Sequence, residues 1–300
     1  MAEVTPVGKP KRFSIVVATD GSMTARAALA TTLTFPWPEE SEVRGVVARR
    51  TRATRGRPGY VLEAFARAFE KAAADARALL SRRWPDVEVT VVDKSPADAI
   101  VDEAHRVRAE VIVLGSHGYG PVRRLLLGSV SRGVVRRAIC SVLVVNRRRK
   151  QIRRLVIGLD GSPHSRRAVE LVAQLPPPPG NLVTLVSALE PISLPSHALL
   201  PATVRVRIGR ELASLKAELA TNARREAEGA EAVLRERGWR VRVVLRSGVP
   251  VEAILSMVRQ TGADFLVIGA RGASGLEGVL LGSVAQGALS HCPVPVLVVR

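Results

Sequence analysis

Cysteine, aromatic residues and long apolar runs are scarce in this chain of 300 residues, and each scarcity excludes a class of protein. The two cysteines, Cys140 and Cys292, lie in separate apolar runs without CxxC spacing or clustered histidines. We interpret them as buried small hydrophobes rather than as a disulfide or a metal site. No apolar run approaches the roughly 18 residues of a membrane span, and no cleavage-site pattern precedes the first strand. We therefore expect a cytoplasmic protein without a membrane segment.

Positive charge is in large excess, with a formal net charge of +18 at pH 7. Such a chain is attracted to nucleic acids and anionic membranes at low salt. The basic clusters Arg49–Arg57, Arg136–Arg137 and Arg147–Lys150 lack interleaved aromatic residues, and no nucleic-acid-binding motif is present. We interpret the arginines as a solvated surface and keep nucleic-acid binding as the least favoured alternative.

The chain contains an internal duplication. The segment Ile15–Ser22 recurs as Leu155–Ser162, and the glycine-containing segment Val111–Val130 recurs as Phe265–Val284. Because these landmarks return in the same order, the sequence predicts two copies of one domain.

The duplication predicts a domain boundary and one difference between the copies. We expect domains at residues 1–148 and 149–300, with a charged segment between them. The second copy is longer between its two landmarks, and we place the insertion near Pro191–Arg207. A long amphipathic pattern at Val204–Arg237 predicts a surface helix with Glu/Arg pairs.

Each copy alternates short aliphatic runs with helical patterns, in a chain that is 47% hydrophobic and 3% aromatic. Continuous aliphatic strands between helices are typical of a parallel sheet covered on both faces. We predict an α/β fold of two tandem, doubly wound parallel sheets of five strands, Rossmann-like, each with strand order 3-2-1-4-5, rather than one large sheet. The predicted strands are 13–19, 43–49, 87–92, 111–115 and 142–146, then 154–159, 182–188, 241–246, 265–269 and 296–300.

The most distinctive motifs fall at the ends of the first and fourth strands of each copy. These two ends flank the switch point, the place where the strand order reverses and where a doubly wound sheet binds its ligand. Strand one ends in a DGS turn that begins at Asp20 and again at Asp160. Strand four ends in the pattern Gx2Gx9GS, formed by Gly115, Gly118, Gly128 and Ser129 and again by Gly269, Gly272, Gly282 and Ser283. The glycines allow close backbone approach, and the Gly-Ser pair opens a helix whose N–H groups attract a phosphate.

Each of these features also has an ordinary structural interpretation. DGS is a common strand-to-helix turn, and Ser129 and Ser283 are typical helix N-caps. Asp20 and Asp160 can accept hydrogen bonds from ribose or base, or hold a hydrated Mg²⁺. No GxxxxGK[ST] phosphate motif is present. Since the whole pattern occurs twice, each time after a DGS strand end, we favour nucleotide binding in at least one copy.

On these residues the chain resembles the universal stress protein family in its tandem-domain form, and its strand-four pattern is similar to the ATP-binding subclass. The resemblance extends over about residues 13–300. It implies an adenine nucleotide alpha hydrolase-like core that binds ATP, ADP or AMP, with or without Mg²⁺. It also implies that the last strands, Ser141–Asn146 and Pro295–Arg300, associate into an intramolecular pseudo-dimer, and it allows a further homodimer.

The resemblance also implies which residues line each pocket. For the first copy these are Asp20, Val46 or Val47, Gly115, His117, Gly118, Gly128, Ser129, Val130 and Ser131. For the second copy they are Asp160, Val183 or a neighbour, Gly269, Arg271, Gly272, Gly282, Ser283 and Val284. The valines on the second strand are expected to contact adenine. Because Ser131 adds a hydroxyl where the second copy has Ala285, we hypothesise that the first copy binds phosphates at least as well as the second.

The predicted function is that of a nucleotide-binding regulator of the stress response, whose occupied form is sensed by an unknown protein partner. The alternative is a slow ATPase or phosphoryl-transfer enzyme, which needs cations on the phosphates and a group that orients the nucleophile. The only nearby candidates are His117, Arg123, Arg124 and Arg271. We assign no catalytic residue and no metal site, because the sequence has neither paired carboxylates nor a nucleophile–base pattern.

Overall fold

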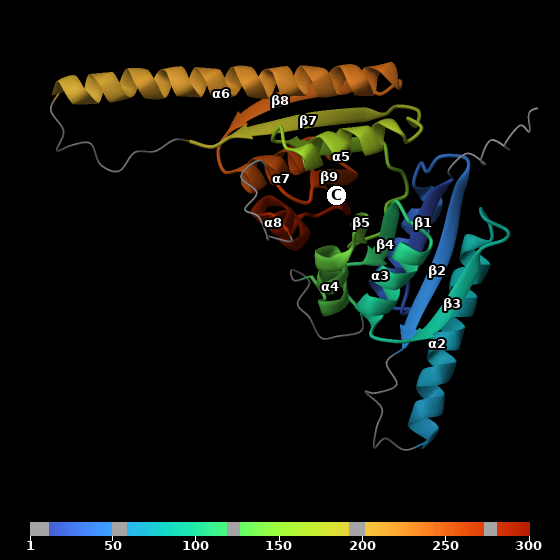
Figure 1. Ribbon diagram of the computed structural model, residues 1–300. Coiled ribbons are helices and arrows are strands. Elements are labelled where there is room, and N and C mark those ends of the chain that lie inside the picture. The colour runs from blue at the N-terminus through green and yellow to red at the C-terminus, as the bar shows by residue number, and fades with distance from the viewer. Residues whose placement is uncertain (1–11, 50–58, 119–126, 192–201, 273–280) are drawn as a thin grey trace, which may run out of the picture.

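The computed structural model describes residues 12–49, 59–118, 127–191, 202–272 and 281–300, which form two copies of one β/α unit (Figure 1). The first copy consists of β1 (Phe13–Ala18), α1 (Met23–Thr34), β2 (Ser41–Arg49), α2 (Gly59–Leu80), β3 (Glu88–Asp93), α3 (Pro96–Arg106), β4 (Val111–Gly115), α4 (Ser129–Arg137) and β5 (Ser141–Val145). The second consists of β6 (Arg154–Leu159), α5 (Pro163–Ala173), β7 (Leu182–Leu189), α6 (Ala202–Glu236), β8 (Val241–Ser247), α7 (Pro250–Gln260), β9 (Phe265–Gly269), α8 (Ser283–His291) and β10 (Val296–Val299).

Each half forms the parallel sheet that the sequence predicts, with strand order 3-2-1-4-5. Across the molecule the order is β3-β2-β1-β4-β5-β10-β9-β6-β7-β8. The expectation of two separate sheets is wrong, because β5 and β10 pair antiparallel, with Leu143 opposite Leu297. The predicted association of the last strands is thus confirmed, and it produces one sheet of ten strands.

Side chains next to β5 and β10 reinforce the junction between the halves. The amide nitrogen Nδ2 of Asn146 donates to the carbonyls of Cys292 (2.9 Å) and Val294 (3.3 Å). Phe35 of the first half packs edge-on against Phe265 of the second, with ring centroids 5.1 Å apart. Both rings are almost fully buried, so this aromatic pair adds to the apolar contact between the halves.

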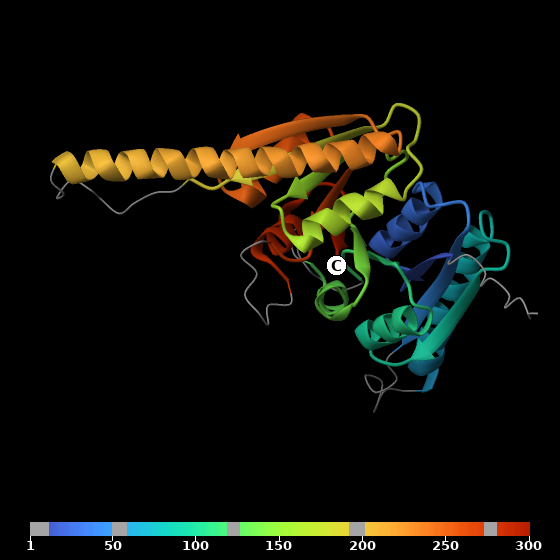
Figure 2. The ribbon, with the colours of Figure 1, turned by 45° about the horizontal axis from the view of Figure 1, so that its top comes forward.

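Two layers of helices cover the sheet, and aliphatic side chains fill the space between the layers (Figure 2). On β1, Ile15 and Val17 point to the face covered by α1 and α2, whereas Val16 and Ala18 point to the face covered by α3 and α4. In the second half, α5 and α6 cover the first face, and α7 and α8 cover the second. The scarcity of aromatic residues therefore does not prevent a large core.

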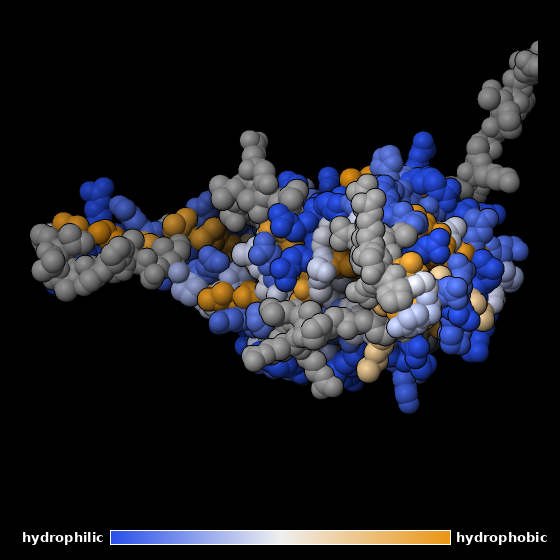
Figure 3. Space-filling view, turned by 90° about the horizontal axis from the view of Figure 1, so that it is seen from below, coloured by the Kyte–Doolittle hydropathy of each residue, from blue (hydrophilic) through white to orange (hydrophobic). Residues whose placement is uncertain are grey.

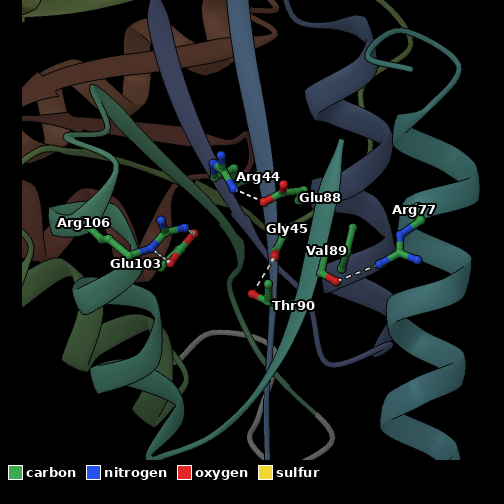
Figure 4. A network of polar contacts seen from close by, with 8 residues as sticks. All are labelled: Arg44, Gly45, Arg77, Glu88, Val89, Thr90, Glu103 and Arg106. Carbon is green, nitrogen blue, oxygen red and sulfur yellow. Dashed lines mark hydrogen bonds and ion pairs between the residues drawn. The ribbon is translucent and has the colours of Figure 1, made fainter. Parts of the chain in front are cut away.

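Polar contacts hold the edge strand β3 against its neighbours (Figure 4). Arg44 on β2 forms an ion pair with Glu88 on β3. From the other side, the guanidinium of Arg77 on α2 donates to the carbonyl of Val89 at 3.1 Å. Because β3 is only half-buried, these contacts supplement a limited apolar contact.

The long surface helix predicted from the sequence is confirmed. It is α6, which extends well beyond the sheet (Figures 1 and 2). Near its C-terminal end, Ala227 and Leu234 are buried where the helix packs on β7 and β8. Near its middle, Leu215 and Leu219 are each 43% exposed. The projecting part of the molecule shows polar and apolar side chains together (Figure 3).

The insertion predicted near Pro191–Arg207 lies partly on residues 192–201, outside the described residues. Helix α6 has 35 residues and the equivalent α2 has 22, so the longer second copy has the longer helix. In the described parts of the chain, no helix combines the length and the apolar character needed to cross a membrane.

Candidate functional site

The DGS turn at the end of β1 begins helix α1 and holds a carboxylate at the strand end. Gly21 has a φ of 82°, in the left-handed region that favours glycine. The N–H of Ser22 donates to Oδ1 of Asp20 at 2.9 Å, and the Ser22 side chain caps α1. In the second copy, the N–H of Ser162 donates to Oδ1 of Asp160 at 3.0 Å. The turn therefore has its ordinary structural role in both copies and also fixes the position of the aspartate.

The second glycine of the strand-four pattern lies directly against this aspartate. A Cβ atom at Gly118 would lie 2.6 Å from Oδ2 of Asp20, and one at Gly272 would lie 2.7 Å from Oδ2 of Asp160. In both copies the end of the first strand and the loop after the fourth strand thus meet at the switch point.

The first glycine of the pattern serves packing between strand and helix. A Cβ atom at Gly115 would lie 2.7 Å from the backbone nitrogen of Ala25 in α1. One at Gly269 would lie 3.0 Å from the backbone nitrogen of Ser165 in α5. The close approach expected of these glycines is therefore an approach to a helix of the same half.

Helices α4 and α8 begin without a side-chain cap. Their N-caps are Gly128 and Gly282, so the interpretation of Ser129 and Ser283 as N-caps is wrong. Each serine is instead the first helical residue, and each is exposed. A helix start without a side-chain cap leaves N–H groups for an anion, which the helix dipole also favours.

A cavity of about 270 Å³ opens beside the N-terminus of α4 in the first copy. One part of its lining is aliphatic and is formed by Ala18, Val46, Ala48, Ile100 and Leu114. The rest includes the other residues predicted from the sequence, namely Asp20, Gly115, His117, Gly118, Gly128, Ser129, Val130 and Ser131. The structure therefore brings together the whole predicted set of the first copy, although this volume is slightly below the roughly 300–1,000 Å³ of typical ligand pockets.

Helix α3 contributes Pro96 and Ile100 to this lining, which the sequence did not predict, since a proline in the first turn indicates only a helix start. Of the two valines considered on β2, Val46 lines the cavity, whereas Val47 is buried on the opposite face of the sheet.

His117 lies at the cavity wall with one ring nitrogen engaged. Its Nδ1 lies 2.9 Å from the hydroxyl oxygen of Ser116, and the two share a hydrogen bond. Its Nε2 is buried and has no hydrogen-bond partner among the described residues. Burial lowers the pKa of His117 below its usual value, which favours the neutral ring. A neutral imidazole with an unused Nε2 suits one hydrogen bond to a ligand.

Ser131 does not have the role that the sequence suggested. Its hydroxyl donates to the carbonyl of Gly115 at 2.7 Å and also contacts the carbonyl of Ser116 at 3.2 Å. Because the residue is 3% exposed and its proton is held by the backbone, it is not an additional donor for phosphate. Its hydroxyl instead fixes the end of β4, a contact that Ala285 lacks in the second copy.

The second copy places a different valine at the equivalent position on its second strand. Val183 is fully buried on the face covered by α5 and α6. Val186 pairs with Gly158 in the same way that Val46 pairs with Ala18 in the first copy. Val186, and not Val183, therefore corresponds to the cavity-lining valine of the first copy.

Arg271 takes the place of His117 in the second copy. Its carbonyl accepts a hydrogen bond from the Ser162 hydroxyl at 3.2 Å, and its Nε is buried without a partner among the described residues. Arg123 and Arg124, the other cations considered near the phosphates, lie outside the described residues. Val284 lies in the first turn of α8, as Val130 does in α4.

Comparisons with known proteins agree with this duplicated architecture. A sequence model of the universal stress protein family matches residues 12–146 and again residues 151–300. A universal stress protein of Mycobacterium tuberculosis is 32% identical over 241 residues, which cover 71% of this chain and 69% of that protein. One from Thermus aquaticus is 30% identical over 146 residues, covering 49% of this chain and 97% of that protein.

A solved structure shows the same fold over nearly the whole chain. The crystal structure of a universal stress protein from Archaeoglobus fulgidus superposes with a TM-score of 0.65 and 19% identity, covering 96% of this chain and 98% of that one. With the two matches to the family model, these findings show that the chain belongs to the universal stress protein family and carries two copies of its domain in tandem.

Proposed function

We propose that the chain binds an adenine nucleotide, ATP, ADP or AMP, with or without Mg²⁺, between the ends of β1 and β4. The observation that carries this proposal is the two-part cavity of the first copy. Val46 and Ile100 form an aliphatic wall that suits a base, and the uncapped N-terminus of α4 suits phosphates. Asp20 lines the same cavity and can accept hydrogen bonds from ribose hydroxyls.

The residues around the cavity fit such a ligand in two further respects. Gly118 leaves beside Asp20 a space that any side chain would fill. The buried Nε2 of His117 offers one more hydrogen bond. In the second copy we propose an equivalent site that uses Asp160, Gly272 and the start of α8.

The proposed role is regulatory. Two domains, residues 1–148 and 149–300, would respond to occupancy, and a protein partner in the cytoplasm would sense the result. Nucleotide occupancy transmits a signal only if the nucleotide binds two arrangements of the halves with different affinities. We do not favour a phosphoryl-transfer enzyme, because His117 hydrogen-bonds to no carboxylate among the described residues.

A pair of variants at the start of α4 tests the proposal. Ser129→Asp adds a carboxylate where phosphate would lie, whereas Ser129→Asn is similar in size and neutral. Asp in the first turn of a helix stabilises it by about 0.3–1 kcal/mol, so the charge should not unfold the domain. We expect repulsion to weaken ATP binding at this site at least about tenfold in the Asp variant and much less in the Asn variant.

The same pair at Ser283 tests the second site. Isothermal titration calorimetry with ATP gives the affinity and stoichiometry, and thermal unfolding checks the fold. Unchanged ATP binding by a Ser129→Asp/Ser283→Asp variant would refute the proposed phosphate position in both copies.

A further inference from the structure

A second cavity, here called the linker basin, lies where the first half leads into the second. It has a volume of about 720 Å³, and its charged lining residues are Arg148, Arg149, Lys150, Arg153, Arg154 and Asp264. Gly180 and Gly262 also line it, in turns with φ of 73° and 59°, and present no side chain. The basin lies at the amino ends of β6 and β9, the opposite end of these strands from the glycine pattern of the second copy.

The positive charge of the linker basin is poorly compensated. Asp264 is the one carboxylate among the described residues that line it. Its Oδ2 accepts the backbone N–H groups of Arg153 and Arg154, each at 3.1 Å, so it primarily anchors the backbone. In the described part of the chain, no carboxylate forms an ion pair with Arg148, Arg149, Lys150 or Arg153.

Arg149 distinguishes the basin from an ordinary solvated run of charges. The residue is half-buried, and its Nε atom is buried without a hydrogen-bond partner among the described residues. Burial also lowers the pKa of Arg149, because the charged guanidinium is less stable when it is held away from water. Its carbonyl accepts from the hydroxyl of Thr34 at 3.4 Å, so the linker contacts the end of α1. An anion bound in the basin would stabilise this partly desolvated charge.

We propose that the linker basin binds an oligophosphate, a small anion with two or more linked phosphates and no nucleobase. Arginine and lysine are the residues that bind phosphate oxygens. Five cations facing one carboxylate exceed the charge that a single phosphate neutralises. The described lining has no aromatic residue and no aliphatic wall like that of the first cavity, so only the arginine side chains could contact a base. This site goes beyond the proposed nucleotide pockets, which lie elsewhere on the sheet.

The test uses the full chain and inorganic tripolyphosphate in a calorimetric titration. At about 0.15 M salt the Debye length is about 8 Å, so isolated surface charges are largely screened. The basin variant Arg148→Gln/Lys150→Gln/Arg153→Gln removes three exposed charges and leaves the half-buried Arg149 in place.

A matched control removes the same charge from the projecting helix. Arg205→Gln/Arg210→Gln/Arg224→Gln changes three exposed arginines of α6 that form no ion pair with described residues. We expect tripolyphosphate binding to weaken at least about tenfold in the basin variant and to stay within about twofold in the control.

An equal loss of tripolyphosphate affinity in the basin variant and the control variant would overturn the proposal, because it would show that the anion is attracted only by the overall charge of the protein. Loss of tripolyphosphate binding in Ser129→Asp/Ser283→Asp would also overturn it, since the anion would then occupy the nucleotide pockets. Retention in that variant supports a separate site, whether or not ATP binding is found. A single-stranded oligonucleotide that competes more tightly than tripolyphosphate would identify nucleic acid as the ligand and refute the proposal.

Discussion

Alanine substitutions at Gly115 and Gly118 should separate the packing role of the strand-four pattern from its proposed binding role. A Cβ atom at Gly115 would meet backbone, 2.7 Å from the nitrogen of Ala25. Because this contact joins a buried strand to a helix, relief requires a backbone shift, and we expect Gly115→Ala to destabilise the fold by about 1–3 kcal/mol.

A Cβ atom at Gly118 would meet a side chain instead, 2.6 Å from Oδ2 of Asp20. The carboxylate can tilt away about its hydrogen bond from the Ser22 N–H, which is a smaller adjustment than a backbone shift, so we expect about 1 kcal/mol of destabilisation or less. That tilt would move the carboxylate out of its position in the cavity. Since a hydrogen bond to a charged group contributes about 1.5–3 kcal/mol, ATP affinity should fall by about 10- to 150-fold at this site.

Urea denaturation measures the first effect and calorimetric titration with ATP measures the second. Gly209→Ala is the control, because a Cβ atom there meets nothing within 4 Å and alanine favours a helix by up to about 1 kcal/mol. The two glycines do not have separate roles if Gly118→Ala unfolds as easily as Gly115→Ala, or if Gly118→Ala binds ATP as tightly as the unsubstituted chain.

Three further predictions concern stability. In urea denaturation, Leu234→Ala at a fully buried position of α6 should cost about 2–5 kcal/mol, whereas Leu215→Ala, at a residue 43% exposed, should cost less than about 0.5 kcal/mol; equal costs would contradict the packing of α6. Asn146→Ala removes two hydrogen bonds across the junction and should cost about 1–2 kcal/mol, and an unchanged midpoint would exclude a role in joining the halves. Burial raises the pKa of the Cys140 and Cys292 thiols from 9.0 to about 11, so folding favours the neutral thiols. Stability should therefore fall from about pH 9 to pH 11, by up to about 1.4 kcal/mol per pH unit for each thiol, and the fall should be shallower in Cys140→Ala/Cys292→Ala. An identical slope in that double variant would rule out the thiols as its cause.

The architecture of each half and the residues that line the first-copy cavity could be predicted from the sequence because topology constrains both. In a doubly wound parallel sheet, the order 3-2-1-4-5 places the ends of the first and fourth strands side by side. Asp20 and Gly118, which are far apart in the sequence, must therefore meet, and the structure brings them into contact. Whether nucleotide binds there stays a prediction.

What the sequence could not predict depends on side-chain orientation and on contacts between distant segments. Strand β7 is buried on both faces and has no alternation of polar and apolar residues, so nothing in the sequence shows that Val186, rather than Val183, faces the second helix layer. The hydroxyl of Ser131 gave no sign that backbone carbonyls would hold its proton. The linker basin forms only when the linker and residues near position 264 come together.

Nucleotide binding by this chain is best tested by measuring the nucleotide content of the protein. Ligand is released from freshly purified protein by denaturation, identified, and quantified against the chain, and ATP is then titrated into the protein in the presence of Mg²⁺. We expect an adenine nucleotide on the purified chain or saturable ATP binding, at a stoichiometry that corresponds to one or both pockets. Absence of bound nucleotide together with no ATP binding in the titration would show that neither pocket binds an adenine nucleotide.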